Sequence, residues 1–158
     1  MSQDLILSRL QALEDIRAIE QVVYGYAYHI DSGEADAWMD LFTDPWILDI
    51  QMLRPDGGRD DHASIRGYDA LKAHITNFKF TNAQSNVISQ PVVQLDGDRA
   101  SSVAYAMVIR ERDGGPQIFS YGRYYDDLTR CADGKWRIAR RVLVMGTFSR
   151  STRPRLKQ

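Results

Sequence analysis

The sequence has very little cysteine, no long hydrophobic run and almost no net charge. Its single cysteine, Cys131, excludes a disulfide framework and a cysteine-based metal cluster within one chain. The formal net charge of -1 leaves no long-range field that would favour a nucleic acid or a membrane surface as partner. The N-terminal segment carries early acidic residues and no extended apolar stretch. We therefore expect neither a signal peptide nor a membrane span, and a cytoplasmic location.

The chain does contain enough apolar material for a hydrophobic core. It has 158 residues, of which 44% are hydrophobic and 26% are charged, as is typical of one soluble globular domain. We expect residues 1–149 to form that single domain. Residues 150–158 include four basic side chains and predict a solvated, flexible tail rather than a nucleic-acid-binding arm.

Helical periodicity dominates the first part of the chain. Apolar residues recur in steps of three and four over residues 5–30, which predicts a long amphipathic helix. Gly33 follows, and glycine suits the left-handed conformation that ends many helices. A short second helix is expected at 34–42, before Pro45, and a third at 68–78.

The second half of the chain has the alternation and turn residues of an antiparallel sheet. Residues 46–52 predict a first strand, whereas the polar, glycine-rich residues 54–67 predict a loop. Further β-rich segments, separated by Asp-Gly turns, are expected at 85–95, 100–112, 117–130 and 135–148. Helices packed on one face of a strongly curved sheet give an α+β fold, a cone with an internal cavity that suits a ligand.

Several short stretches within this order of elements resemble one family. They read "YAYHIDSGEADAWMDLFTDPWILD", "IRGYDALKAHI", "QLDGDRASSVAYAMV" and "YGRYYDDLTRCADGKWRIARR". The chain is similar to the SnoaL-like group of the nuclear-transport-factor-2-like superfamily, whose relatives include steroid isomerases, scytalone dehydratase, polyketide cyclases and the β subunits of ring-hydroxylating dioxygenases. This fold hosts many chemistries and also non-enzymes, so the resemblance implies the fold more strongly than the reaction.

Asp49 is the first candidate for chemistry. It stands in the otherwise apolar segment "WILDIQM", where an aspartate is costly to bury unless it is paired or its pKa rises. A raised pKa is what a general base needs near neutral pH. The resemblance adds that this position matches the catalytic base of the steroid isomerases. The alternative is a strand aspartate that is exposed or bonded to a loop amide.

Tyr26 and Asp31 are the next candidates, and both depend on the resemblance. Tyr26 stands five residues before Asp31, where the steroid isomerases have a tyrosine that donates to the substrate oxyanion. A helix tyrosine packed in the core is the alternative. Asp31 matches a catalytic aspartate of scytalone dehydratase, but Asp-Ser-Gly is also ordinary turn chemistry, and we favour the structural role.

A wider set of residues is expected to contact a ligand: His29, His74, Asn86, Tyr124 and Arg141. Single histidines are more often surface or hydrogen-bonded residues than catalysts, and His62, beside two aspartates in the predicted loop, is expected to be solvated rather than a metal ligand. Relatives often place a histidine just before the Ser-Asn pair of the second strand, but residues 81–86 contain none. Gln84 or Asn86 would supply hydrogen bonds there instead.

These residues favour one function over another of a different class. The favoured hypothesis is a cofactor-independent lyase or isomerase, without a metal, that moves a proton on a small aromatic, polycyclic or terpenoid-like molecule. The alternative is a non-catalytic ligand-binding or assembly module resembling a dioxygenase β subunit. No acid stands near Ile118, where the steroid isomerases carry their second oxyanion donor, and this favours the alternative. By resemblance we expect a homodimer or a larger oligomer, with some of the strand aromatics in its interface.

Overall fold

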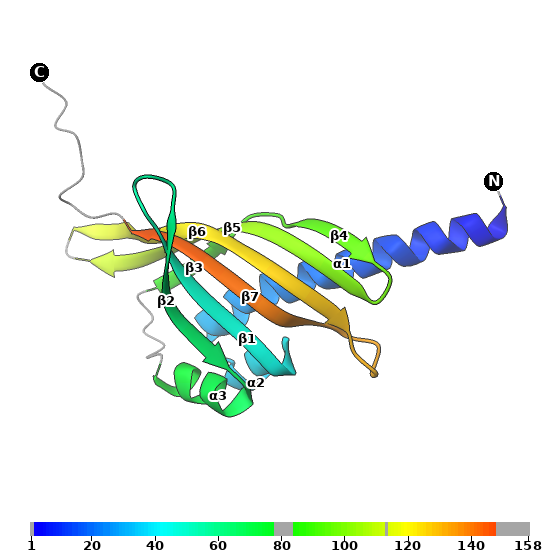
Figure 1. Ribbon diagram of the computed structural model, residues 1–158, viewed down its shortest axis with the longest axis horizontal. Coiled ribbons are helices and arrows are strands. Elements are labelled where there is room, and N and C mark those ends of the chain that lie inside the picture. The colour runs from blue at the N-terminus through cyan, green and yellow to red at the C-terminus, as the bar shows by residue number, and fades with distance from the viewer. Residues whose placement is uncertain (1, 78–83, 113, 148–158) are drawn as a thin grey trace, which may run out of the picture.

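The structure, a computed structural model, describes residues 2–77, 84–112 and 114–147. Its helices are α1 (Gln3–Ser32), α2 (Ala35–Met39) and α3 (Tyr68–Asn77). Its strands are β1 (Phe42–Leu53), β2 (Arg59–Arg66), β3 (Gln84–Ile88), β4 (Val92–Asp96), β5 (Arg99–Arg112), β6 (Gly115–Arg130) and β7 (Trp136–Thr147). This arrangement confirms the α+β class (Figure 1). The predicted tail at 150–158 and the predicted helix end at Phe78 lie outside the described residues.

Both ends of α1 are set by local chemistry. The hydroxyl of Ser2 accepts a hydrogen bond from the backbone N–H of Leu5, and Asp4 places a negative charge in the first turn. At the other end Gly33 has φ 73°, and its N–H donates to the carbonyl groups of His29 and Ile30. The predicted glycine stop is therefore confirmed.

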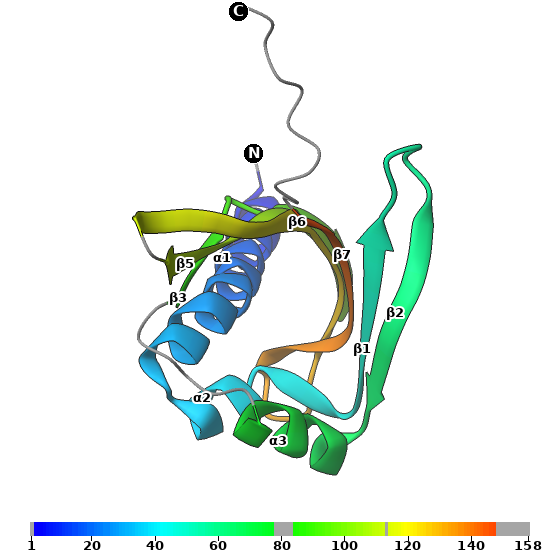
Figure 2. The ribbon, with the colours of Figure 1, turned by 90° about the vertical axis from the view of Figure 1, so that its left-hand side faces the viewer.

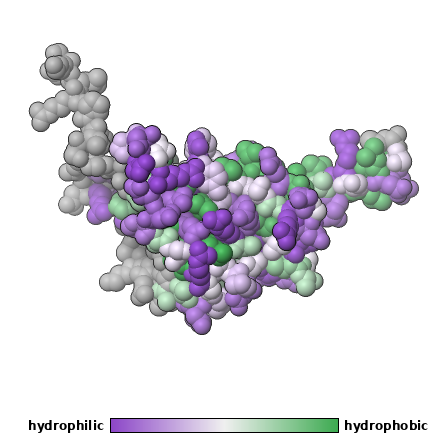
Figure 3. Space-filling model, in the orientation of Figure 1, coloured by the Kyte–Doolittle hydropathy of each residue, from purple (hydrophilic) through white to green (hydrophobic). Residues whose placement is uncertain are grey.

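The first turns of α1 extend beyond the sheet (Figure 1). Large apolar side chains are exposed along this part of the helix: Leu5, Ile6, Leu7, Leu10 and Leu13. In the space-filling view, hydrophilic residues cover most of this face of the molecule, and hydrophobic residues show as separate patches (Figure 3). Within the described residues, no helix is both long and apolar enough to cross a membrane.

The described strands form one mixed sheet that curls around α1 (Figure 2). The order of strands is β2-β1-β7-β6-β5-β3, and β4 also pairs with β5. β1 and β7 run parallel, whereas the other described pairs are antiparallel. The curl is tight at Gly122, where an added Cβ would collide with the carbonyl oxygen of Val144 on the neighbouring strand. The prediction of a strongly curved, mainly antiparallel sheet is confirmed.

Three predicted elements differ from the structure. The second helix, expected at 34–42, ends at Met39, and Phe42 already belongs to β1. Residues 54–67 were expected to be a loop, but Arg59–Arg66 form β2, which pairs antiparallel with β1. β2 is an edge strand whose side chains are almost all exposed, so its polar composition reflects its position and not a lack of structure. The predicted strand 85–95 is divided into β3 and β4, and Pro91, which cannot donate to a ladder, lies in the break.

Aromatic side chains from α1, α2 and β1 form the centre of the core. Trp38, Phe42 and Trp46 are buried, and the ring of Phe42 lies 4.6 Å from that of Trp38 and 4.1 Å from that of Trp46. Tyr26 continues this cluster, with its ring 5.2 Å from Trp38 and 5.4 Å from Tyr124. These contacts hold α1 and α2 against the concave face of the sheet.

A fully buried ion pair lies beneath the aromatic cluster. Nε of Arg141 donates to one carboxylate oxygen of Asp126 at 2.6 Å, and Nη2 donates to the other at 2.7 Å. Ser102 also donates to Asp126, at 3.3 Å. The guanidinium carbon of Arg141 lies 4.2 Å from the ring centres of both Tyr26 and Tyr124. Burial alone would lower the pKa of Arg141, but Asp126 outweighs it and raises the pKa, so the guanidinium stays charged.

Breaking this pair should be costly. We expect Arg141→Met to lower the free energy of unfolding by about 3–5 kcal/mol, because it leaves the Asp126 carboxylate buried without its partner. Urea unfolding at neutral pH measures the loss. Asp40→Asn is the matched control, since Asp40 pairs with Lys135 and Arg137 at the surface and should cost about 1 kcal/mol or less. Equal losses in the two variants would contradict this account of the core.

Candidate functional site

A cavity of about 370 Å³ lies between the C-terminal part of α1 and the concave face of the sheet. This volume lies within the range of small-molecule sites. Most of the lining is apolar and includes Ile30, Leu48, Ile50, Met52, Leu143 and Met145. Alternation along the strands explains this composition, because every second residue of β1 and β7 faces the cavity.

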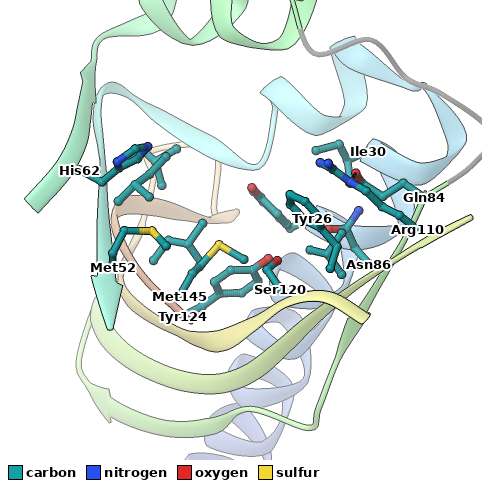
Figure 4. A pocket seen from close by; sticks show the side chains of 15 residues that line it. Tyr26, Ile30, Met52, His62, Gln84, Asn86, Arg110, Ser120, Tyr124 and Met145 are labelled. Atoms are coloured by element: carbon teal, nitrogen blue, oxygen red, sulfur yellow. Dashed lines mark hydrogen bonds between the residues drawn. The ribbon is translucent and has the colours of Figure 1, made fainter. Parts of the chain in front are cut away.

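Tyr26 and Tyr124 form the inner wall of the cavity (Figure 4). Burial raises the pKa of both phenols above the ordinary value, and this effect outweighs the opposing influence of Arg141. Both side chains are therefore neutral at physiological pH and keep their hydroxyl protons. A neutral phenol in a largely apolar cavity is suited to donate a hydrogen bond to a ligand oxygen.

The polar groups of the cavity gather on β3, β5 and β6. Arg110 donates from Nε to the amide oxygen of Gln84 at 2.9 Å, and its guanidinium carbon lies 3.5 Å from the ring centre of Phe119. Burial and the neighbouring charge of Arg112 lower the pKa of Arg110. Asn86 and Ser120 also line the cavity. Arg110 and Ser120 were not among the predicted site residues, because strand alternation in the sequence does not say which face is concave.

His62 lies across the cavity from this polar group (Figure 4). It is the extra residue of a β-bulge, since Ile50 pairs with Ala63 while Gln51 pairs with Asp61. Such bulges redirect a side chain and are frequent beside functional sites. His62 was expected to be a solvated loop residue. It is exposed, as expected, but its segment is a strand and its side chain also lines the cavity.

Asp49 does not line the cavity, although it was the first candidate for catalysis. It lies between Leu48 and Ile50 on β1 and faces the opposite side of the sheet. Ser64 donates to it at 2.7 Å, and Arg140 donates to its other oxygen at 2.9 Å. Burial alone would raise the pKa of Asp49, but these contacts outweigh it and lower the pKa. The expected raised pKa is therefore not found, and an ionised, paired carboxylate is a poor general base.

Asp31 and Asn86 meet at the end of α1. The backbone N–H of Asn86 donates to Asp31 at 2.8 Å, and its side-chain amide donates to the other oxygen at 2.5 Å. Asp31 is outside the cavity lining and ties α1 to β3. This geometry agrees with the structural role that the sequence favoured for Asp31, and it fixes the amide of Asn86 at the cavity wall.

The remaining candidates lie in different places. Tyr124 lines the cavity, whereas Arg141 is completely buried behind the tyrosines and supports them from beneath. His29 is outside the lining, and its Nδ1 lies 2.6 Å from a carboxylate oxygen of Glu34. His74 belongs to α3, and its side chain lies outside the described part of the structure. Of the eight residues proposed from the sequence, the cavity brings together Tyr26, Asn86 and Tyr124.

The family follows from the sequence match. The SnoaL-like domain profile matches residues 11–142, so the chain belongs to the SnoaL-like family. No protein of curated function has a sequence that matches this chain significantly.

Similar solved structures share the fold at low identity. An NTF2-like protein with a cystatin-like fold from Novosphingobium aromaticivorans has a TM-score of 0.76 and 21% identity, covering 99% of this chain and 98% of its own. A protein from the same organism, assigned as the β subunit of an aromatic-ring-hydroxylating dioxygenase, has a TM-score of 0.73, 20% identity and coverage of 87% and 93%. Another, assigned as a scytalone dehydratase, has a TM-score of 0.66, 21% identity and coverage of 93% and 97%. These similarities show the cystatin-like α+β cone.

The charge of Asp49 should contribute to the stability of the fold, because Asp49 lies outside the cavity lining and is paired with arginines. We expect Asp49→Asn to lower the free energy of unfolding at neutral pH, because it removes the acceptor for Arg140 and Arg66. A carboxyl whose pKa is lowered by folding stabilises the fold at any pH above its ordinary pKa of 3.8. This stabilisation is lost as the pH falls through the pKa of the folded state. Urea unfolding at neutral pH and below pH 3.8 measures the free energy of unfolding of the unchanged protein and of Asp49→Asn, and the difference between them should shrink in acid. A gap that widens in acid would contradict the assignment.

Proposed function

We propose that the chain is a cofactor-independent enzyme of the lyase or isomerase type, which transfers a proton on a small hydrophobic molecule. The observation that carries this proposal is a largely apolar cavity that joins one imidazole, that of His62, to buried neutral phenols. The structural similarity to a protein assigned as a scytalone dehydratase supports the same class of reaction.

His62 takes the role that the sequence suggested for Asp49. Imidazole is the side chain that most readily accepts and releases a proton near neutral pH. Among the described residues that line the cavity there is no carboxylate, so His62 is the natural group there to move a proton to or from carbon. His62 belongs to a bulged edge strand, and its side chain lies on the same side of the cavity as Met52, with Tyr26 further across (Figure 4).

Tyr26 supplies the hydrogen bond that such a reaction needs. Removing a proton next to a carbonyl group builds negative charge on the carbonyl oxygen, and a fixed neutral donor stabilises that charge. The guanidinium of Arg141 lies 4.2 Å from the centre of the Tyr26 ring, on the side of the core, and keeps the ring in place. The phenol is thus oriented before a ligand enters.

The proton transfer can be measured before the natural substrate is known. β-Tetralone is a bicyclic ketone, and the exchange of its α-protons in heavy water can be followed by NMR. We expect the protein to accelerate exchange above the buffer rate, and His62→Gln to reduce the acceleration by roughly 10²- to 10⁴-fold. Tyr26→Phe should reduce it by about 10²-fold, because it removes the donor and keeps the ring.

Asp49→Asn is the matched control, since Asp49 lies outside the cavity and is expected to leave the exchange rate unchanged. Circular dichroism checks that each variant is folded. Equal exchange by folded His62→Gln and the unchanged protein would refute the role of His62. A large loss of exchange rate in Asp49→Asn alone would instead identify Asp49 as the base, as the sequence suggested.

The outer face of the sheet is suited to a protein interface, with a second copy of the chain or with a larger subunit. Val87, Tyr105 and Tyr121 are 44%, 60% and 40% exposed, and they line a shallow groove on β3, β5 and β6. Exposed aromatic residues on a sheet face suit a protein interface. We propose that two copies of the chain pair through this face. In the alternative, a larger catalytic subunit occupies it, as the similarity to an assigned dioxygenase β subunit suggests.

Sedimentation separates these possibilities. We expect a species of twice the chain mass, which Tyr105→Lys should convert to monomer because it places a charge in the interface. Tyr68→Lys is the matched control, since Tyr68 is similarly exposed, at 44%, but lies on α3 away from this face. A monomer that co-purifies with a larger subunit would instead support the assembly module.

A further inference from the structure

The polar groups of the cavity form a cluster on three adjacent strands. Gln84 of β3 lies opposite Arg110 of β5, and two pairs further along Asn86 lies opposite Val108. Val108 in turn lies opposite Ser120 of β6, so Asn86 and Ser120 flank Val108, two residues from Arg110 along β5, and all of these residues line the same cavity. In Figure 4 Gln84, Asn86 and Arg110 lie on one side of the cavity, and His62 lies on the other. The cavity therefore has a polar end at Arg110, an imidazole at the opposite end and a mainly apolar lining between them.

Arg110 is held in place by an amide oxygen and an aromatic ring. Its Nε–H donates to Gln84, and its guanidinium stacks on the ring of Phe119, which is the extra residue of a second bulge. Among the described residues, no carboxylate pairs with Arg110. The terminal nitrogens of the guanidinium have two parallel N–H groups, the arrangement that matches the two oxygens of a carboxylate.

Ser120 gives an independent indication of a ligand. Ser120 is only 3% exposed and lines the cavity, and its hydroxyl has no hydrogen-bond partner among the described residues. A buried hydroxyl is normally satisfied, and leaving it unpaired destabilises the fold. A ligand oxygen at the Arg110 end of the cavity would accept from this hydroxyl.

We infer that the ligand is an amphipathic carboxylic acid, whose carboxylate is bound by Arg110 and Ser120 and whose apolar ring system fills the space toward His62. This inference rests on the proposed function for the use of the cavity as a ligand site, and it adds the chemical class of the ligand. The carboxylate fixes the orientation of the ring, so that the carbon distant from the acid group faces the imidazole. Gln84 positions this polar end of the cavity by accepting a hydrogen bond from Arg110. Asn86 is itself fixed there by its hydrogen bond to Asp31.

Naphthoate and its neutral amide, naphthamide, test the inference, because they differ in charge and hardly in shape. Isothermal titration calorimetry measures the affinity of each for the full chain. We expect naphthoate to bind at least about tenfold more tightly than naphthamide, and Arg110→Gln to weaken naphthoate by about 10- to 100-fold while it changes naphthamide little. Arg110→Lys should recover part of the affinity, and Ser120→Ala should weaken naphthoate less than Arg110→Gln does.

Arg112→Gln is the matched control. It removes the same charge two residues further along β5, at an exposed position outside the cavity lining, and should leave the preference for naphthoate intact. Equal affinity of the unchanged protein for the two compounds, including no binding of either, would overturn the inference. Equal losses in Arg110→Gln and Arg112→Gln would overturn it as well, since they would reveal only a long-range charge effect. Binding is measured without turnover, so failure of the proton-transfer proposal and failure of carboxylate recognition are separate results.

Discussion

A guanidinium and a carboxylate without exposed surface connect the core of this molecule to its cavity. Arg141 and Asp126 face each other from neighbouring strands, and the flat guanidinium lies against the rings of Tyr26 and Tyr124. Such a pair is costly to desolvate, and it tolerates little displacement because both charges must stay matched. It therefore fixes where the two tyrosines stand. Since these tyrosines form the inner wall of the cavity, the position of that wall depends on a charge pair that lies outside the cavity lining.

Much of the fold could be predicted from the sequence because its patterns are local. The long helix, its glycine end and the strands of the second half follow from periodicity and turn residues. β2 could not be predicted in this way, since an edge strand needs no buried face and so has no apolar alternation. The parallel pairing of β1 with β7 joins distant segments and leaves no trace in local composition.

The site was less predictable than the fold, for reasons that individual residues make clear. Tyr26, proposed from its helical position and a family resemblance, does line the cavity. Asp49 was misplaced because its apolar neighbours suggested burial in the cavity, whereas the strand turns its side chain to the outer face, where Arg140 neutralises it. His62 and Phe119 were missed because both are bulge residues. A bulge shifts the alternation by one residue, so the residue facing the cavity is known only once the register of both strands is known.

The parallel pairing of β1 with β7 also has a consequence for how the chain is made. β1 emerges from the ribosome before the other described strands, but the strand beside which it must lie, β7, is the last of the described strands to be synthesised. The cavity wall formed by β1 and β7, and the tyrosines supported by Arg141, can therefore assemble only when almost all of the chain is available. Closing so long a loop slows folding. A ligand of this cavity would therefore stabilise only a chain that already includes β7, because the lining needs residues of both strands.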